Sequence, residues 1–240
     1  MTIHLIDGEK GGVGKSWIAF VVIEYLASRN IPCYLYAADR SNPTAASRYK
    51  DKQRYADFYD DSVHYAVFSE DDKKADDPDV IIDMATERTV VIDLPAQVHY
   101  PLTSWLQKKD IFRLSKANGI DWIRWFVCNG EEDSINLLIT SAAFYQNQKT
   151  ILVRNHGLCD DWSYFNDHPE LQSTIEKYQI TVIDFPKLVD SKRIKINANR
   201  WTFDEAVDLG KFNIVGKSDI HQYVQKAFQL LDSIKVLEVL

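Results

Sequence analysis

The chain has 240 residues, of which 45% are hydrophobic and 26% charged, as expected for a folded globular protein rather than a disordered or collagen-like one. This length predicts a single domain over residues 1–240, and no apolar run approaches the roughly 20 residues needed to span a bilayer. A formal net charge of −7 argues against a broad DNA-binding surface, because phosphate neutralisation needs clustered Lys and Arg. The three cysteines form no C-x-x-C pair, which predicts a reduced, cytoplasmic protein without a zinc site.

Short apolar runs alternate with helical stretches along the chain, which predicts an α/β fold: a mostly parallel β-sheet with helices on both faces. The expected strands are Ile3–Ile6, Cys33–Ala37, Thr89–Ile92, Trp122–Val127, Thr150–Val153 and Ile180–Ile183. The expected helices are Lys15–Ser28, Pro101–Lys116, Ser134–Gln146, Pro169–Tyr178 and Ser218–Ile234.

The segment from Asp57 to Asp83 differs from the rest in composition, with ten acidic residues and two lysines. We interpret most of it as a solvated excursion from the fold, with a strand expected at His64–Phe68. An acidic surface that binds a partner is the alternative.

A glycine-rich loop follows the first expected strand and ends Gly-Lys-Ser where the first helix starts, which is the context that a phosphate-binding loop requires. Glycines let backbone N–H groups turn toward a phosphate, and the helix N-terminus adds its dipole. Lys15 supplies a cation, and the Ser16 hydroxyl is a ligand for Mg²⁺. The expected ATP-binding residues here are Gly11, Gly12, Val13, Gly14, Lys15, Ser16 and Trp17.

The loop departs from the ordinary G-x-x-x-x-G-K-S pattern because Glu9 and Lys10 precede the glycine pair. Lys-Gly-Gly-Val-Gly-Lys-Ser resembles the deviant Walker A ATPases, which include ParA, MinD and relatives in plasmid mobilisation. The resemblance implies an ATP-dependent homodimer in which Lys10 reaches the neighbour's phosphates, with Lys10, Lys15 and Asp39 as catalytic residues. Trp17 departs from the small hydroxyl residue usual in this family, which leaves a backbone contact to the α-phosphate.

Two acidic residues follow expected strands, so both would lie at the carboxyl edge of the sheet, where ligands bind in such folds. Asp39 comes shortly after Cys33–Ala37, and Asp93 directly follows Thr89–Ile92. By resemblance, Asp39 positions the attacking water and touches the magnesium shell, and Asp93 holds Mg²⁺ through water. The expected metal-site residues are therefore Ser16, Asp39 and Asp93. An acidic residue that only opens a turn is the alternative for each carboxylate.

The adenine site is expected in the second half of the chain. Asn155 follows the Thr150–Val153 strand and resembles the residue that reads the adenine edge, since an amide offers both a donor and an acceptor. Phe185 and Pro186 resemble the loop that flanks the base. Asn129, after the preceding strand, competes with Asn155 for this role.

Whether such an ATPase binds DNA or a membrane depends on the charged and apolar residues of its surface. The segment from Lys187 to Arg200 is the most basic one and is the candidate DNA contact, with a solvated loop as the alternative. The last helix carries an apolar stripe that is expected to pack on the sheet, and its mixed charges make membrane binding unfavoured. Thr202 is expected to begin a capped helix.

The favoured hypothesis is a ParA-like ATPase that switches between nucleotide states in plasmid partition, stability or conjugative transfer, together with a partner protein. The alternatives are a metabolic P-loop ligase or kinase, a MinD-like positioning ATPase acting on a membrane or protein scaffold, and a nucleotide-bound adaptor without turnover. The first of these would need an acceptor-substrate site, for which the sequence shows no clustered His, Cys or carboxylate residues.

Overall fold

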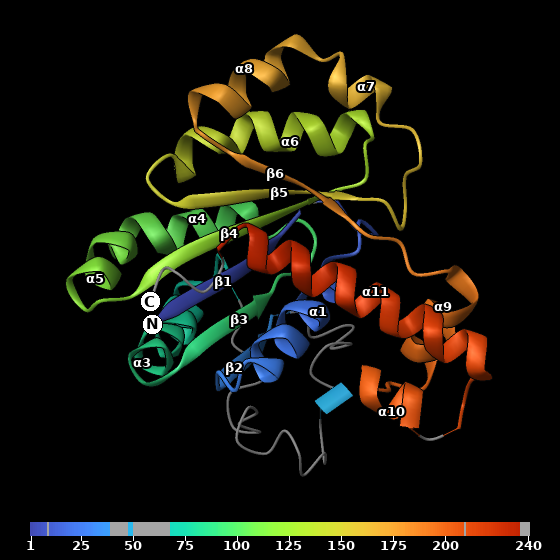
Figure 1. Ribbon diagram of the computed structural model, residues 1–240. Coiled ribbons are helices and arrows are strands. Elements are labelled where there is room, and N and C mark those ends of the chain that lie inside the picture. Colours follow the sequence, from blue (N-terminus) through green and yellow to red (C-terminus); the bar gives the residue numbers. More distant parts are fainter. Residues whose placement is uncertain (9, 39–47, 50–67, 209, 236–240) are drawn as a thin grey trace.

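Six parallel strands form one sheet in the order β2-β3-β1-β4-β5-β6 (Figure 1). The computed structural model describes residues 1–8, 10–38, 48–49, 68–208 and 210–235. The strands are β1 (Thr2–Asp7), β2 (Cys33–Ala37), β3 (Thr89–Asp93), β4 (Asp121–Cys128), β5 (Lys149–Asn155) and β6 (Thr181–Phe185). The predicted parallel α/β fold and its six strands are confirmed. The extra strand predicted at His64–Phe68 lies outside the described residues, apart from Phe68.

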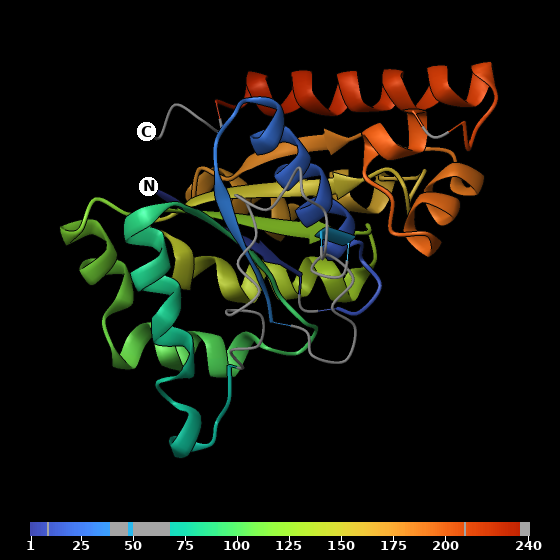
Figure 2. The same ribbon diagram turned by 90° about the horizontal axis from the view of Figure 1, so that it is seen from below.

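Helices cover both faces of the sheet, which Figure 2 shows nearly edge-on. One face carries α1 (Lys15–Ser28), α9 (Asp190–Ala198), α10 (Phe203–Asp208) and α11 (Ile214–Ser233). The other face carries α3 (Val80–Glu87), α4 (His99–Lys108), α5 (Ile111–Ala117), α6 (Glu132–Ala142), α7 (Ser163–Asn166) and α8 (Pro169–Lys177). Short 3₁₀ turns are η3 (Asp72–Lys74), η4 (Asp77–Asp79) and η5 (Ala143–Tyr145).

Most strand residues are apolar and buried because helices cover both faces of the sheet. In β3, Val90 and Ile92 pack with α3, α4 and α5, whereas Val91 between them packs with α1. This alternation follows from the two-residue repeat of a strand. Within the described residues, the apolar side chains form three clusters, one under α1 and α11 and two on the opposite face.

Several predicted boundaries were wrong. The helix expected over Ser134–Gln146 is α6 followed by the 3₁₀ turn η5. The helix expected over Pro101–Lys116 is two helices, because Asp110 adopts a left-handed φ of 51° that α-helical geometry cannot accommodate. The last helix begins at Ile214, where the Asn213 side chain accepts a hydrogen bond from the Gly216 N–H at 2.8 Å. The acidic excursion expected up to Asp83 ends earlier, since α3 begins at Val80 and buries Ile81.

Two other predictions on helices are confirmed. The apolar stripe of α11 packs against the sheet, with Ile220, Tyr223, Ala227 and Leu231 buried. Thr202 caps α10 reciprocally with Glu205: the Thr202 N–H donates to Glu205 Oε2 at 2.8 Å, and the Glu205 N–H donates to Thr202 Oγ1 at 3.2 Å. No helix in the described part of the chain is long and apolar enough to cross a membrane.

Candidate nucleotide site

The glycine loop joins β1 to α1 at the carboxyl edge of the sheet, as the sequence predicts (Figure 1). Lys15 is 8% exposed, and its side chain bends back over the loop. Its Nζ donates to the carbonyl oxygens of Gly8 at 2.6 Å and Lys10 at 3.1 Å. Val13 is fully buried and anchors the middle of the loop in the core. The lysine is therefore held above the N-terminus of α1, where a phosphate would be favoured.

The loop is clamped from the neighbouring part of the sheet by Asn155, which ends β5. Its Nδ2 donates to the Val13 carbonyl at 2.9 Å, and its Oδ1 accepts from the Gly157 N–H at 3.0 Å. Gly14 has a φ of 98°, and a Cβ there would lie 2.4 Å from Asn155 Nδ2. Glycine is required at this position both for its φ and for the space that the asparagine occupies. This clamping role of Asn155 was missed in the sequence.

A buried ion pair supports the loop from beneath. Asp7 at the end of β1 accepts from the Gly8 N–H at 2.6 Å, and its other oxygen lies 2.7 Å from the Arg124 guanidinium. Arg124 also donates to Ser141 Oγ at 2.7 Å and lies 4.0 Å from the Tyr145 ring centroid. Both charged side chains are almost fully buried, so each needs the other to offset its lost hydration. A charged residue within each of two neighbouring apolar strands is the signal that could have revealed this pair.

Asp93 lies at the same edge, as expected. It ends β3 beside β1, in register with Ile6, and is 2% exposed. The chain after it returns to the loop, since a Cβ added to Gly11 would lie 3.9 Å from Ala96 Cβ. The structure thus brings the Asp93 segment next to the glycine loop. Asp39, the other predicted carboxylate, lies outside the described residues.

Lys10 does not point into its own loop. Its ammonium group contacts the Glu131 carboxylate and lies 3.4 Å from Asp133 Oδ2, both at the N-terminus of α6. The hydrogen bond with Glu131 raises the pKa of Lys10 and lowers that of Glu131. The Lys10 side chain is 34% exposed, so it is accessible from outside the chain.

A small pocket opens beside the loop on the α9 side and includes two of the predicted adenine-site residues, Asn155 and Pro186. It is lined by Gly12, Gly14, Trp17, Asn155, Gly157, Leu158, Pro186, Leu188 and Arg193. Trp17 is oriented there by a 2.7 Å hydrogen bond from its Nε1 to the Tyr223 hydroxyl. Phe185 does not line the pocket, because its side chain is fully buried in the core. Asn129 accepts a 3.4 Å hydrogen bond from the Glu131 N–H and is not among the lining residues either.

The basic segment from Lys187 to Arg200 forms α9 rather than a loop over Asp190–Ala198, and much of its charge is paired. Lys192 pairs with Asp219 at 2.8 Å, Arg193 with Asp190 at 2.8 Å, and Lys187 with Asp160 at 3.1 Å. Lys195 Nζ donates to the Lys211 carbonyl at 2.7 Å. Arg193 also lines the pocket beside Trp17, a position that the sequence did not predict.

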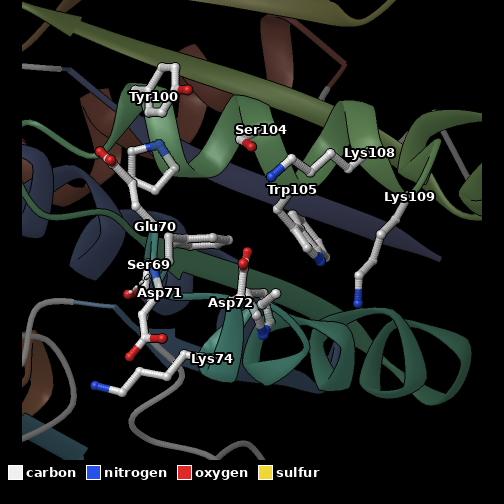
Figure 3. A pocket seen from close by; sticks show the side chains of 14 residues that line it. Ser69, Glu70, Asp71, Asp72, Lys74, Tyr100, Ser104, Trp105, Lys108 and Lys109 are labelled. Carbon is white, nitrogen blue, oxygen red and sulfur yellow. Dashed lines mark hydrogen bonds between the residues drawn. The ribbon is translucent and has the colours of Figure 1, made fainter.

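A second hollow of about 160 Å³ lies away from the loop, between residues 68–78 and α4 (Figure 3). Phe68 and Trp105 are two of its apolar lining residues, with ring centroids 5.6 Å apart. Figure 3 shows Ser104 and Lys108 of α4 on one side, with Glu70 and Asp72 facing them. Among the described residues that line this hollow, none belongs to the glycine loop, so the hollow is separate from the candidate nucleotide site.

Together, the parallel sheet and the glycine loop at its carboxyl edge define a P-loop NTPase-like protein. Solved structures that share this fold include two MinD proteins and a plasmid-partition protein. The cell division ATPase MinD of Pyrococcus furiosus is 14% identical and has a TM-score of 0.56, covering 95% of this chain and 99% of that one. MinD of Pyrococcus horikoshii OT3, complexed with Mg-ADP, is 16% identical with a TM-score of 0.51, covering 94% and 96%.

The third structure is a protein assigned to plasmid partition in Borrelia burgdorferi B31, bound to AMPPNP, which is 16% identical with a TM-score of 0.52 and covers 95% and 98%. Among curated proteins, MobD of Acidithiobacillus ferrooxidans is 22% identical in an alignment of 241 positions that covers 97% of this chain and 97% of MobD. No family model matches the chain. The resemblance to ParA and MinD ATPases identified from the loop is thus confirmed in the fold.

Proposed function

We propose that the chain binds and hydrolyses Mg-ATP and acts as an ATP-dependent dimeric switch. The observation that carries this proposal is the glycine loop itself: Lys15 lies over it, Asn155 clamps it, and the Asp93 segment lies beside it. A bound ATP would supply the phosphates, and Mg²⁺ would neutralise their charge. Lys15 would bind the β- and γ-phosphates, and the Ser16 hydroxyl would ligate Mg²⁺. Asp93 would hold the metal through water.

The remaining predicted residues complete this site. The N–H groups of Gly11, Gly12, Val13 and Gly14 would surround the phosphates, and Trp17, Asn155 and Pro186 would flank the base. Asp39 would position the attacking water. The nucleotides named for two structures of this fold, Mg-ADP and AMPPNP, support an adenine nucleotide as the ligand.

The direction of the Lys10 side chain, away from its own loop and toward Glu131, supports a role for this lysine at a second chain. In the proposed dimer it reaches the neighbour's phosphates, as a finger residue supplied in trans does in other P-loop enzymes. A role in plasmid partition or transfer is supported by likeness to the partition protein and, over the full chain, to MobD. DNA contact through Lys187–Arg200 belongs to this proposal, although the ion pairs of Lys187, Lys192 and Arg193 reduce the charge available for it.

The test uses Lys15→Ala, Lys10→Ala and Asp39→Ala. Lys15→Ala should lose Mg-ATP binding in calorimetry, because it removes the cation held over the loop. Lys10→Ala should bind nucleotide but fail to form dimers, whereas Asp39→Ala should form ATP dimers without turnover. Light scattering in ADP and in ATP, with ATP turnover measured with and without DNA, distinguishes these outcomes. A wild-type protein that stays monomeric in every nucleotide state would contradict the dimeric switch.

A further inference from the structure

The Lys10 side chain is engaged within its own chain, and this contact has a consequence for the proposed dimer. Glu131 precedes α6 as its N-cap residue, and Asp133 lies in its first turn. The two carboxylates converge on one ammonium group from the start of α6, the helix that follows β4. Strand β4 pairs with β1, which leads into the glycine loop. The helix dipole of α6 favours negative charge at this end, which suits two carboxylates at this position.

The backbone of Lys10 is also engaged, because its carbonyl accepts from Lys15 Nζ at 3.1 Å. Lys10 is therefore held both by its backbone carbonyl and by its side-chain ammonium group. Phosphates arriving at the loop would compete with the Gly8 and Lys10 carbonyls for the Lys15 ammonium group. Phosphates of a second chain would compete with Glu131 and Asp133 for the Lys10 ammonium group.

We propose that Glu131 and Asp133 form a latch that holds Lys10 within the single chain and so opposes the pairing of two ATP-bound chains. The inference rests on the proposed function, because it presumes that Lys10 acts across a dimer. The two ion pairs of this latch are weak because their carboxylates are exposed to water. Glu131 is 57% exposed and Asp133 is 75% exposed, so water screens the attraction.

The size of the effect follows from this exposure. An exposed ion pair shifts an equilibrium by about 1.4- to 5-fold. A symmetric dimer must open two latches, one in each chain, so the factor is squared. Removing the latch should therefore tighten the dimer by about 2- to 30-fold, a range that a protein concentration series can resolve.

Glu132 provides a matched control. It lies next to Glu131 in the first turn of α6, is exposed and has the same charge, but it makes no contact with Lys10. Glu131→Gln and Glu132→Gln change the net charge of the chain equally. Any general effect of charge on association should appear in both variants, whereas loss of the latch should appear only in Glu131→Gln.

The experiment is sedimentation velocity of the full chain with Mg²⁺ and AMPPNP over a concentration series. We expect a tighter dimer for Glu131→Gln and a dissociation constant within about 1.5-fold of wild type for Glu132→Gln. Equal behaviour of the two variants, or a weaker dimer for Glu131→Gln, would overturn the latch while leaving the dimeric switch intact. A wild type that never dimerises would overturn both proposals.

A second readout does not depend on the dimer. Mass spectrometry of partial acetylation reports the reactivity of each lysine amine in the monomer. Without nucleotide, Lys10 should react faster in Glu131→Gln than in wild type, and Lys217 should react equally in both. Unchanged reactivity of Lys10 would mean that the contact does not hold the lysine in solution, which would also overturn the latch.

Discussion

The buried pair of Asp7 and Arg124 offers the most decisive test of how the glycine loop is supported. Replacing Arg124 with Met keeps much of its volume but leaves the Asp7 carboxylate buried without its cation. Breaking a buried ion pair by removing one partner costs about 3–5 kcal/mol. For a chain of this length, that corresponds to a fall in melting temperature of about 6–20 °C. Asp7→Asn should also lower stability, because it leaves the buried Arg124 guanidinium without its carboxylate.

The double variant Asp7→Asn, Arg124→Met distinguishes the contribution of the ion pair from the cost of leaving one buried charge unpaired. The asparagine Oδ1 can still accept from the Gly8 N–H, and no unpaired charge remains, so the double variant should be more stable than either single variant. Urea unfolding gives the free energy of unfolding of each variant, provided that its dependence on urea concentration has the same slope in all variants. Arg29→Met, which breaks the exposed pair with Asp232, is the control and should cost at most about 1 kcal/mol. If the double variant loses as much unfolding free energy as the two single variants together, Asp7 and Arg124 do not stabilise the fold as a pair.

Three further predictions concern the loop and the core. Asn155→Ala should weaken Mg-ADP binding by about 2- to 13-fold in calorimetry, because it removes the one buried hydrogen bond from this side chain to Val13. Unchanged affinity would show that this hydrogen bond does not contribute to nucleotide binding. Gly14→Ala should destabilise the protein well beyond Gly119→Ala, because both glycines have a positive φ but only Gly14 has a neighbour within 4 Å; equal melting temperatures would contradict this. Burial, with a smaller contribution from Lys149, lowers the pKa of His4 to about 3, so the unfolded chain binds this proton more readily. Stability contributed by neutral His4 is complete above pH 6.5 and should fall by about 2 kcal/mol between pH 7 and pH 5, an effect that His4→Gln should abolish in urea unfolding.

The sequence was sufficient for the parts of the molecule that depend on local pattern. Each of the six strands contains a short apolar run that marks it in the sequence, because helices cover both faces of the sheet. Helix α1 was predicted with both ends correct, because a glycine loop precedes it and Ile31-Pro32 follows it. The location of the loop at the carboxyl edge follows from the parallel order of the strands.

The tertiary structure decided what no local pattern contains. Asn155 clamps Val13 across 142 residues of sequence, and Lys10 meets Glu131 across 121, so neither contact has a spacing that a sequence motif records. Phe185 faces the core rather than the pocket because alternate residues of β6 point to opposite faces. Arg193 reaches the pocket because α9 turns it toward Trp17. The sequence by itself determined the chemistry available at the loop, and the packing of the strands and helices around it decided which side chains hold that loop in place.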